Sequence, residues 1–358
     1  MHGTLCAAAL KILFIKRDKL GDLLLTTPVL EHARAQLPHA ELHVLANDYN
    51  AWVVRDHPAV TRLWVYPRVR HAGRVRLRAA LAYPRLALAL RAQCFDWAIV
   101  AGGDESPRGI RRALATRAVR TVAYAAAPAA YGSRLTDPLW PAEGHEVERM
   151  FRELEVVGVK RPDRLGVPTF VVPQAWRATA DTWLAARGLA RRRFIVLGLG
   201  ARRARKQPSA EQIARWTTEW HARWQLPTVF MWTPGRSDSP LYPGDDDIAE
   251  PVLARKLPHL VPFRGPIPEA IGLLDAATAS LVPDSGLMHF AAATPGGVIG
   301  LFAAPEESAP AARWAPIGPR ASWLEAERAV SELPDAVIHA AVERLVEGTA
   351  AANTPASA

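Results

Sequence analysis

The sequence predicts an α/β protein in which parallel β-sheets are built from βαβ units. Short apolar segments rich in β-branched residues alternate along the chain with longer segments of helical spacing, which is typical of parallel sheets. The alternation runs through both halves of the chain, and a proline-rich stretch without periodicity, residues 161–173, lies between them. Since 358 residues are enough for two domains of ordinary size, we expect a set of βαβ units in each half.

The composition is that of a globular protein. Hydrophobic residues make up 49% of the chain and charged residues 22%. No apolar run reaches the ~20 residues that a membrane helix needs. The first 19 residues do not resemble a signal peptide, because Lys11 interrupts their apolar stretch. Cys6 and Cys94 give no disulfide framework, so we expect a cytoplasmic protein.

The net charge of +9 favours an anionic partner. Of the 44 basic residues only six are lysine, and the rest are arginine. Charge alone does not choose among a phosphorylated sugar, a nucleotide, a nucleic acid and an acidic membrane surface.

The first expected strand is residues 10–15, and residues 23–36 have helical spacing. The connection between them carries Lys16, Arg17 and the pair Gly21-Asp22. Gly21 permits a tight turn, and Asp22 stands where a helix cap belongs. Asp22 is therefore either a cap or, at the carboxyl edge of a parallel sheet, a carboxylate that can act as a general base.

Three more strands are expected in the first half, at residues 41–46, 61–66 and 97–101. A loop at residues 102–108 follows the last of them. An amphipathic helix begins after Gly144 and runs to about Val157, and we expect it to serve packing.

A basic segment occupies residues 68–78. Runs of charge of this kind are usually a solvated face, and the alternative is a landing site for an acidic acceptor or a membrane surface. The segment contains Arg68, Arg70, His71, Arg74, Arg76 and Arg78.

The second half begins with a helix at residues 174–187 and a buried strand at residues 194–199. Gly200 and a run of cations follow, and Ser209 then caps a helix that carries Trp216, Trp220 and Trp224. A glycine and several cations between a strand and a helix are a candidate cradle for a diphosphate, with a solvent-exposed basic loop as the alternative.

The remaining segments continue this pattern. The loop at residues 234–247 is long for a compact domain, which favours a functional role. The other expected elements are a strand at residues 228–233, a short helix within residues 264–273, a proline-rich loop at residues 303–320 and an amphipathic helix at residues 331–347.

Residues 282–302 form the stretch around which we expect the chain to be organised. A strand ending at Val282 is broken by Pro283 and Asp284, and Ser285 and Gly286 precede a helix at residues 287–293. A strand, a turn and a helix start together expose backbone N–H groups that suit a phosphate. The alternative is that Asp284 or Ser285 only caps the helix.

Four segments in this order resemble one known family. They are residues 16–28 (KRDKLGDLLLTTP), residues 145–158 (HEVERMFRELEVVG), residues 200–214 with Lys206, and residues 283–293 (PDSGLMHFAAA) followed by residues 300–305 and 313–319. Together they resemble the heptosyltransferases of bacterial lipopolysaccharide biosynthesis, glycosyltransferase family nine. The resemblance extends from about Leu10 to Glu347.

The resemblance implies a GT-B fold, in which two Rossmann-like domains with parallel sheets face a central cleft. It also implies an inverting transferase that moves a heptose from a nucleotide diphosphate donor, usually ADP-heptose, and needs no metal. The expected parts are an acceptor-binding domain (residues 1–165), a linker (166–176), a nucleotide-sugar-binding domain (177–330), a C-terminal helix (331–347) and a disordered tail (348–358).

Roles carry over from the family by position. The resemblance makes Asp22 the base that deprotonates the acceptor hydroxyl. Family members often have hydroxyl residues where Ala201 and Arg202 stand, so arginines of this loop are added to the donor set. The expected donor-binding residues are Arg202, Arg205, Lys206, Asp284, Ser285, Gly286 and His289, and the expected acceptor-binding residues are Lys16, Arg17, Arg74 and Arg76.

The resemblance implies no cofactor beyond the nucleotide sugar. It implies a phosphorylated glycolipid acceptor, the lipopolysaccharide inner core, with peripheral contact at the cytoplasmic face of the inner membrane. An epimerase or hydrolase of nucleotide sugars is the alternative. A nucleic-acid-binding protein fits the charge, but no recognisable nucleic-acid module occurs in the sequence.

Overall fold

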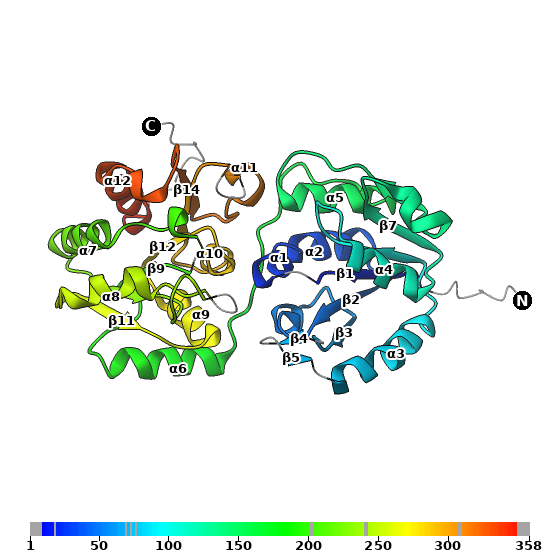
Figure 1. Cartoon of the computed structure of the whole chain (residues 1–358), viewed down its shortest axis with the longest axis horizontal. Helices are drawn as coiled ribbons and strands as arrows, with labels where there is room; N and C mark the ends of the chain where they lie inside the picture. The colour runs from blue at the N-terminus through cyan, green and yellow to red at the C-terminus, as the bar shows by residue number, and fades with distance from the viewer. Residues whose placement is uncertain are drawn as a thin grey trace, which may run out of the picture. The chain divides into compact units, whose positions relative to one another are not determined.

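The structure is a computed structural model that describes residues 9–17, 19–68, 70–71, 74–75, 77–200, 203–239, 243–306 and 310–348. The chain divides into two compact units, Met1–Gly166 and Val167–Ala358, each with its own sheet (Figure 1). The division falls at the start of the expected linker, whose last residues belong to the first helix of the second unit. Of the expected tail, residues 348–358, only Gly348 is among the described residues.

The first unit is built on a six-stranded sheet in the order β3-β2-β1-β6-β7-β8. Every neighbouring pair of strands in this sheet is parallel. A short antiparallel hairpin, β4 (Arg70–His71) with β5 (Arg74–Val75), lies outside it. The strands of the sheet are β1 (Lys11–Ile15), β2 (Glu41–Asn47), β3 (Arg62–Tyr66), β6 (Trp97–Ile99), β7 (Arg120–Tyr124) and β8 (Asp137–Leu139).

The second unit repeats this topology. Its sheet has the order β11-β10-β9-β12-β13-β14, again with all neighbours parallel. Both sheets therefore have the doubly wound order of Rossmann folds, which confirms the predicted α/β class with two Rossmann-like units. The strands are β9 (Ile195–Gly198), β10 (Thr228–Met231), β11 (Leu260–Phe263), β12 (Ala279–Pro283), β13 (Val298–Phe302) and β14 (Ala321–Glu325).

Helices connect the strands, as parallel pairing requires. In the second unit α7 packs against α8 and α12, and α9 packs against α6 and α10 (Figure 1). The helices of the first unit are α1 (Leu20–Leu24), α2 (Thr27–Gln36), α3 (Leu77–Arg91), α4 (Pro107–Thr116) and α5 (Glu146–Val156). Those of the second are α6 (Gln174–Ala185), α7 (Ala210–Trp224), α8 (Asp246–Ala254), α9 (Ile267–Ala276), α10 (Gly286–Ala292), α11 (Ala311–Trp314) and α12 (Asp335–Val346).

The single helix expected at residues 23–36 is wrong, because the structure has two helices, α1 and α2. Pro28 lies in the first turn of α2 and cannot donate a backbone hydrogen bond to the preceding turn. The hydroxyls of Thr26 and Thr27 instead donate to the carbonyls of Asp22 and Leu24, at 3.0 and 2.8 Å. Helix α1 consequently starts earlier than predicted and places Asp22 inside its first turn.

Several elements gave no clear sequence signal. Helix α8 begins inside the segment expected to be a long loop, and Ser106 starts α4 where only a loop was expected. Strand β14 follows directly on the proline-rich loop, within which α11 forms. Strand β14 and helix α11 are too short to show a period, whereas α4 has an apolar face with helical spacing, at Ile110, Ala113 and Leu114, that the sequence analysis did not use.

Tryptophans of α7 fill the core of the second unit. The side chains of Trp216 and Trp220 are fully buried, and their ring planes stack with centroids 6.4 Å apart. The indole N–H of Trp216 donates to Asp335 at 2.6 Å, and that of Trp220 bonds with His339 at 3.1 Å. Both partners lie on α12, so these two side chains attach the C-terminal helix to the core.

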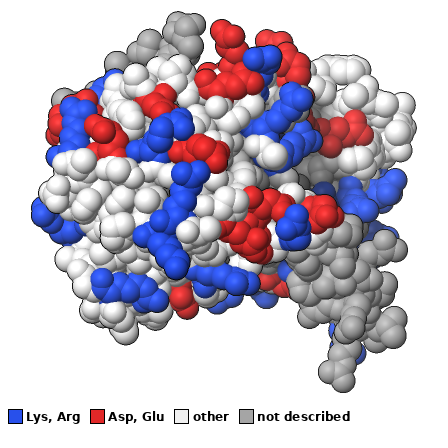
Figure 2. All heavy atoms as spheres, turned by 60° about the vertical axis from the view of Figure 1, so that its left-hand side comes forward, with Lys and Arg blue, Asp and Glu red and all other residues white. Residues whose placement is uncertain are grey.

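Opposite charges are interspersed on the face drawn in Figure 2. Ion pairs on α7, α8 and α12 illustrate the mixing, with Arg215–Asp335 at 2.7 Å and Arg255–Glu211 at 3.0 Å. The positive net charge is therefore not gathered into one continuous basic surface on this face. Within the described residues no helix is both long and apolar enough to cross a membrane.

Replacement of Trp220 by alanine should lower the free energy of unfolding by about 3–5 kcal/mol, because it empties a large buried site. Chemical denaturation followed by circular dichroism measures the effect. Val171→Ala is the matched control in the same unit, since Val171 is 81% exposed and its truncation should change stability by less than about 0.5 kcal/mol. Equal effects of the two substitutions would contradict this account of the core.

Candidate functional site

The strand order of each sheet defines one edge where a ligand is expected. In doubly wound sheets the crevice lies beyond the carboxyl ends of the strands, between the two strands at which the order reverses. These are β1 and β6 in the first unit and β9 and β12 in the second. The segments that leave these four strands carry most of the residues singled out in the sequence.

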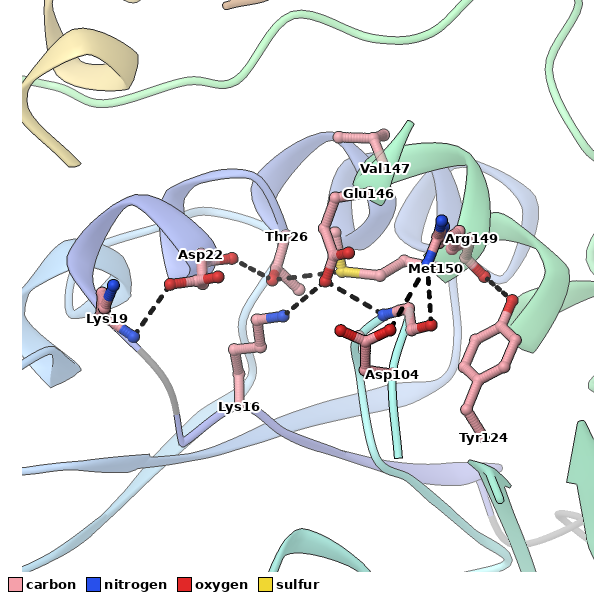
Figure 3. A network of polar contacts seen from close by, with 12 residues as sticks. Lys16, Lys19, Asp22, Thr26, Asp104, Tyr124, Glu146, Val147, Arg149 and Met150 are labelled. Atoms are coloured by element: carbon pink, nitrogen blue, oxygen red, sulfur yellow. Dashed lines mark hydrogen bonds and ion pairs between the residues drawn. The ribbon is translucent and has the colours of Figure 1, made fainter. Parts of the chain in front are cut away.

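Asp22 lies in the first turn of α1, shortly after the carboxyl end of β1. It is half-buried, and its Oδ2 accepts a hydrogen bond from the backbone N–H of Lys19 at 3.0 Å. The N-cap residue of α1 is Lys19 and not Asp22, but Asp22 still contributes to capping, because from the third position of the helix it accepts this backbone bond. The same bond fixes the direction of the carboxylate at the carboxyl edge of the sheet (Figure 3).

Lys16 does not have the exposure expected of an acceptor-binding residue. It follows β1 directly, and its side chain is only 1% exposed. Its Nζ lies 3.4 Å from Oε1 of Glu146, the first residue of α5 (Figure 3). The burial and the ion pair make Lys16 an internal residue of this edge, which corrects the expected direct contact with an acceptor.

The loop after β6 is held against the same helix. Glu146 Oε1 also accepts from the backbone N–H of Gly103 at 3.0 Å, and the Arg149 guanidinium donates to the Gly103 carbonyl at 3.2 Å. A Cβ on Gly103 would lie 2.1 Å from Cδ of Arg149, so any other residue there would displace the Arg149 side chain. Arg149 also pairs with Asp104 at 3.5 Å, which joins β6, its loop and α5 into one network (Figure 3).

A second acidic residue of α5, two turns after Glu146, also contacts the loop after β6. Glu153 is 1% exposed, and its Oε2 accepts from the backbone N–H of Gly102 at 3.3 Å. Within the described residues its Oε1 has no hydrogen-bond partner. Burial raises the pKa of the Glu153 carboxyl well above its usual value, although the nearby charge of Lys16 opposes the shift.

In the second unit the structure brings together two residues predicted from separate motifs. Lys206 ends the short 3₁₀ turn Ala204–Lys206 after β9, and Asp284 follows β12. The Lys206 Nζ donates to Asp284 Oδ2 at 2.5 Å, and the two side chains are 15% and 14% exposed. The two side chains are therefore largely shielded from water but still accessible to a ligand. Such an environment strengthens the attraction between the Lys206 ammonium and an anion.

The start of α10 lies beside this pair. Ser285 is the N-cap residue, but its side chain makes no capping hydrogen bond, and its buried Oγ has no partner within the described residues. Gly286 begins the helix, where backbone N–H groups lack the carbonyl of a preceding turn, although that of Met288 donates to the Ser285 carbonyl at 3.2 Å. A Cβ on Gly200 would lie 3.7 Å from Ser285 Oγ, which brings the loop after β9 close to this helix start.

The other predicted site residues lie at several places, and some of them are outside the described residues. His289 is buried within α10 and Arg205 is exposed in the 3₁₀ turn. Arg17 is half-buried after β1, and Arg68 pairs with Asp48 at 2.9 Å at the start of the basic segment. Of the remaining predictions, Arg202 and Arg76 lie outside the described residues, and only the backbone of Arg74 is described, in β5.

The described side chains contain no group of three or more His, Cys, Asp or Glu residues arranged to hold a metal ion.

The family model for glycosyltransferase family 9 (heptosyltransferase) matches residues 84–339, which is more than half of the chain. The chain belongs to this family. It is therefore a glycosyltransferase of the heptosyltransferase type. The matched segment includes Lys206, Asp284 and α5 but begins after Asp22, so the role of Asp22 depends on the resemblance of residues 16–28 and on its position at the sheet edge.

Solved structures share the fold of this family 9 protein. A family 9 glycosyl transferase from Veillonella parvula is 18% identical with a TM-score of 0.78, covering 95% of this chain and 97% of the other. The ADP-heptose lps heptosyltransferase II of E. coli is 17% identical with a TM-score of 0.70, covering 96% and 100%. E. coli heptosyltransferase WaaC with ADP is 17% identical with a TM-score of 0.65, covering 95% and 99%. A comparison with curated protein sequences finds no match.

Sequence reasoning missed the acidic residues of α5 as part of the site. Their signal was present, because Glu146 and Glu153 are seven residues apart and so share a helix face with buried Met150 and Leu154. Two acids on an otherwise apolar face are unusual, since carboxylates are almost never fully buried unless paired. The sequence could not show that Lys16 and the loop after β6 are their partners.

Replacement of Glu153 by glutamine should make the stability of the protein less sensitive to pH. Because the native pKa of Glu153 is raised, the folded protein retains a proton that the unfolded chain has released. Wild-type stability should then fall as the pH rises above the usual glutamate value, by up to about 1.4 kcal/mol per pH unit, until the native pKa is reached. The Gln variant lacks this fall.

Urea denaturation between pH 4 and pH 9 measures this difference. Glu155→Gln is the matched control, because Glu155 is an exposed residue of the same helix. A Glu153→Gln profile parallel to that of the wild type would show that Glu153 is charged in the native protein.

Proposed function

We propose that this protein transfers a heptose, with inversion and without a metal, from ADP-heptose or a closely related nucleotide sugar to a lipopolysaccharide-core acceptor. The observation that carries the proposal is the Lys206–Asp284 pair at the carboxyl edge of the second sheet, in a chain of glycosyltransferase family 9. The relatives of known structure include WaaC with ADP-2-deoxy-2-fluoro heptose, which supports a nucleotide sugar as donor.

The chemistry of glycosyl transfer matches the charges at this edge. As the glycosidic bond breaks, positive charge develops on the sugar ring and negative charge on the departing diphosphate. In the proposal, Lys206, the arginines of its loop and the first-turn N–H groups of α10 stabilise the diphosphate. When the donor binds, Asp284 accepts hydrogen bonds from hydroxyls of the donor sugar. The diphosphate replaces the Asp284 carboxylate as the partner of the Lys206 ammonium.

The acceptor side of the proposal is assigned to the first unit. Asp22 takes the proton of the attacking hydroxyl, and its bond from the Lys19 backbone keeps the carboxylate oriented for this. The acceptor is proposed to be a phosphorylated glycolipid at the cytoplasmic face of the inner membrane, contacted by Arg17, Arg74 and Arg76.

Asp22→Asn should lower kcat by about 10²–10⁴-fold, because the amide cannot accept the proton. Donor affinity should be unchanged, since Asp22 belongs to the other unit. Steady-state transfer assays and calorimetric titration with nucleotide diphosphate separate the two quantities. Turnover of Asp22→Asn at the wild-type rate would exclude Asp22 as the base.

Among nucleotide diphosphates and nucleotide sugars, those of adenine should give the largest thermal shift. Lys206→Met should weaken this binding and lower kcat/KM by about 10²–10³-fold, as expected when one preorganised electrostatic contact is removed. Arg236→Met, which removes an exposed cation from another loop, is the control. Consumption of the donor without any acceptor would instead favour an epimerase or hydrolase.

A further inference from the structure

The loop from Gly200 to Gln207, between β9 and α7, carries Lys206 and is called the diphosphate-binding loop below. We propose that Asp245 and Gln207 are positioning residues that anchor this loop and so aim Lys206 at the donor. The inference rests on the proposed function of that loop. Neither residue was singled out in the sequence, and neither is argued to touch the substrate.

One oxygen of Asp245 joins the ends of two neighbouring strands. Asp245 is 3% exposed and stands at the start of α8. Its Oδ2 accepts from the backbone N–H groups of Gly200, after β9, and of Thr233, after β10, at 3.2 and 2.8 Å. This oxygen therefore holds the first residue of the diphosphate-binding loop against the neighbouring strand end.

The other oxygen of Asp245 holds the far end of the same loop. Its Oδ1 accepts from the side-chain amide of Gln207 at 2.5 Å, and Gln207 is 5% exposed. Gln207 directly follows Lys206, whose backbone is also held in the 3₁₀ turn by a bond to the Arg203 carbonyl at 3.0 Å. The loop is thus fixed on both sides of the point where Lys206 leaves it.

This anchoring matters because the Lys206 side chain is long and flexible. Catalytic groups must be held to within about 0.5 Å of the productive geometry, and buried hydrogen bonds behind them provide this. In this proposal Asp245 acts through orientation and not through its charge, because a carboxylate close to an anion site repels the anion. Burial raises the pKa of Asp245, and the hydrogen bonds that it accepts oppose this shift.

The next two residues of the chain supply a contrast. Asp246 accepts from the Trp232 indole and the Gly235 backbone, at 2.9 and 2.7 Å. Asp247 accepts from the Ser237 backbone and hydroxyl, at 2.8 and 2.5 Å. Both contact the loop after β10, and of these three aspartates only Asp245 contacts the described part of the loop that carries Lys206.

A reciprocal exchange of the two groups tests the anchor. Gln207→Glu places a carboxylate against Asp245 Oδ1, which should raise donor KM about tenfold through the lost charge-assisted hydrogen bond, with a smaller change in kcat. In the double variant with Asp245→Asn, the new amide can donate to the carboxylate introduced at position 207 while its oxygen keeps both backbone bonds. Donor KM should then return to within about threefold of wild type.

Two further readouts separate positioning from general stability. Lowering the pH from 8 to 5.5 should restore the Gln207→Glu variant in part, because the facing carboxylates can then share a proton. Hydrogen–deuterium exchange of residues 199–209, without ligand, should rise in Gln207→Glu and fall again in the double variant. Asp247→Asn is the matched control and should change neither donor KM nor exchange in this loop.

The outcomes are distinguishable. Unchanged exchange in Gln207→Glu would overturn the anchor. Raised exchange with unchanged donor KM, or a double variant no better than Gln207→Glu, would overturn its positioning role. Failure of every nucleotide diphosphate to bind the wild type would overturn the proposed function, while the exchange measurement would still decide whether the anchor exists.

Discussion

The parallel pairing of β9 with β12 is the constraint on which the candidate site of the second unit depends. It brings together two segments that are about 80 residues apart in the chain, and the Lys206–Asp284 ion pair is the direct result. Neighbouring parallel strands end at the same edge, so the loops that leave them must lie side by side. A cation and a carboxylate are thereby held together at a helix start, where an anion is favoured.

The first unit uses the same arrangement for a different purpose. Pairing of β1 with β6 places Lys16 against the glycine loop that follows β6, and α5 contributes Glu146 and Glu153 beneath it. Lys16, Glu146 and Glu153 are all buried in this network. It holds the residue that directly follows β1 against the loop that follows β6, as Asp245 is proposed to hold the segment that carries Lys206. In both units charged residues inside the fold hold the loops in place.

Much of the fold was predictable because the hydrophobic pattern of buried parallel strands is local. The strand Val298–Phe302 and the capping box between Ser209 and Gln212 appear in the structure as the residues indicate. The predicted helix over residues 23–36 was wrong because Pro28 and two threonine hydroxyls interrupt it, and hydrophobic spacing does not register such side-chain bonds. The short strand β14 was missed because its identity depends on pairing with β13 and not on its own residues.

The sequence by itself determined the α/β class and the division into two similar halves, because strand and helix periods and turn residues are properties of neighbouring positions. The selection of Lys206 and Asp284 came from the family resemblance, and their roles stay predictions. Only the tertiary structure decided which of these residues meet. It joined Lys206 to Asp284, buried Lys16 against Glu146, and linked Asp245 to Gly200 and Gln207 on either side of Lys206. Contacts between distant segments are set by strand order and side-chain packing, and no local pattern records either.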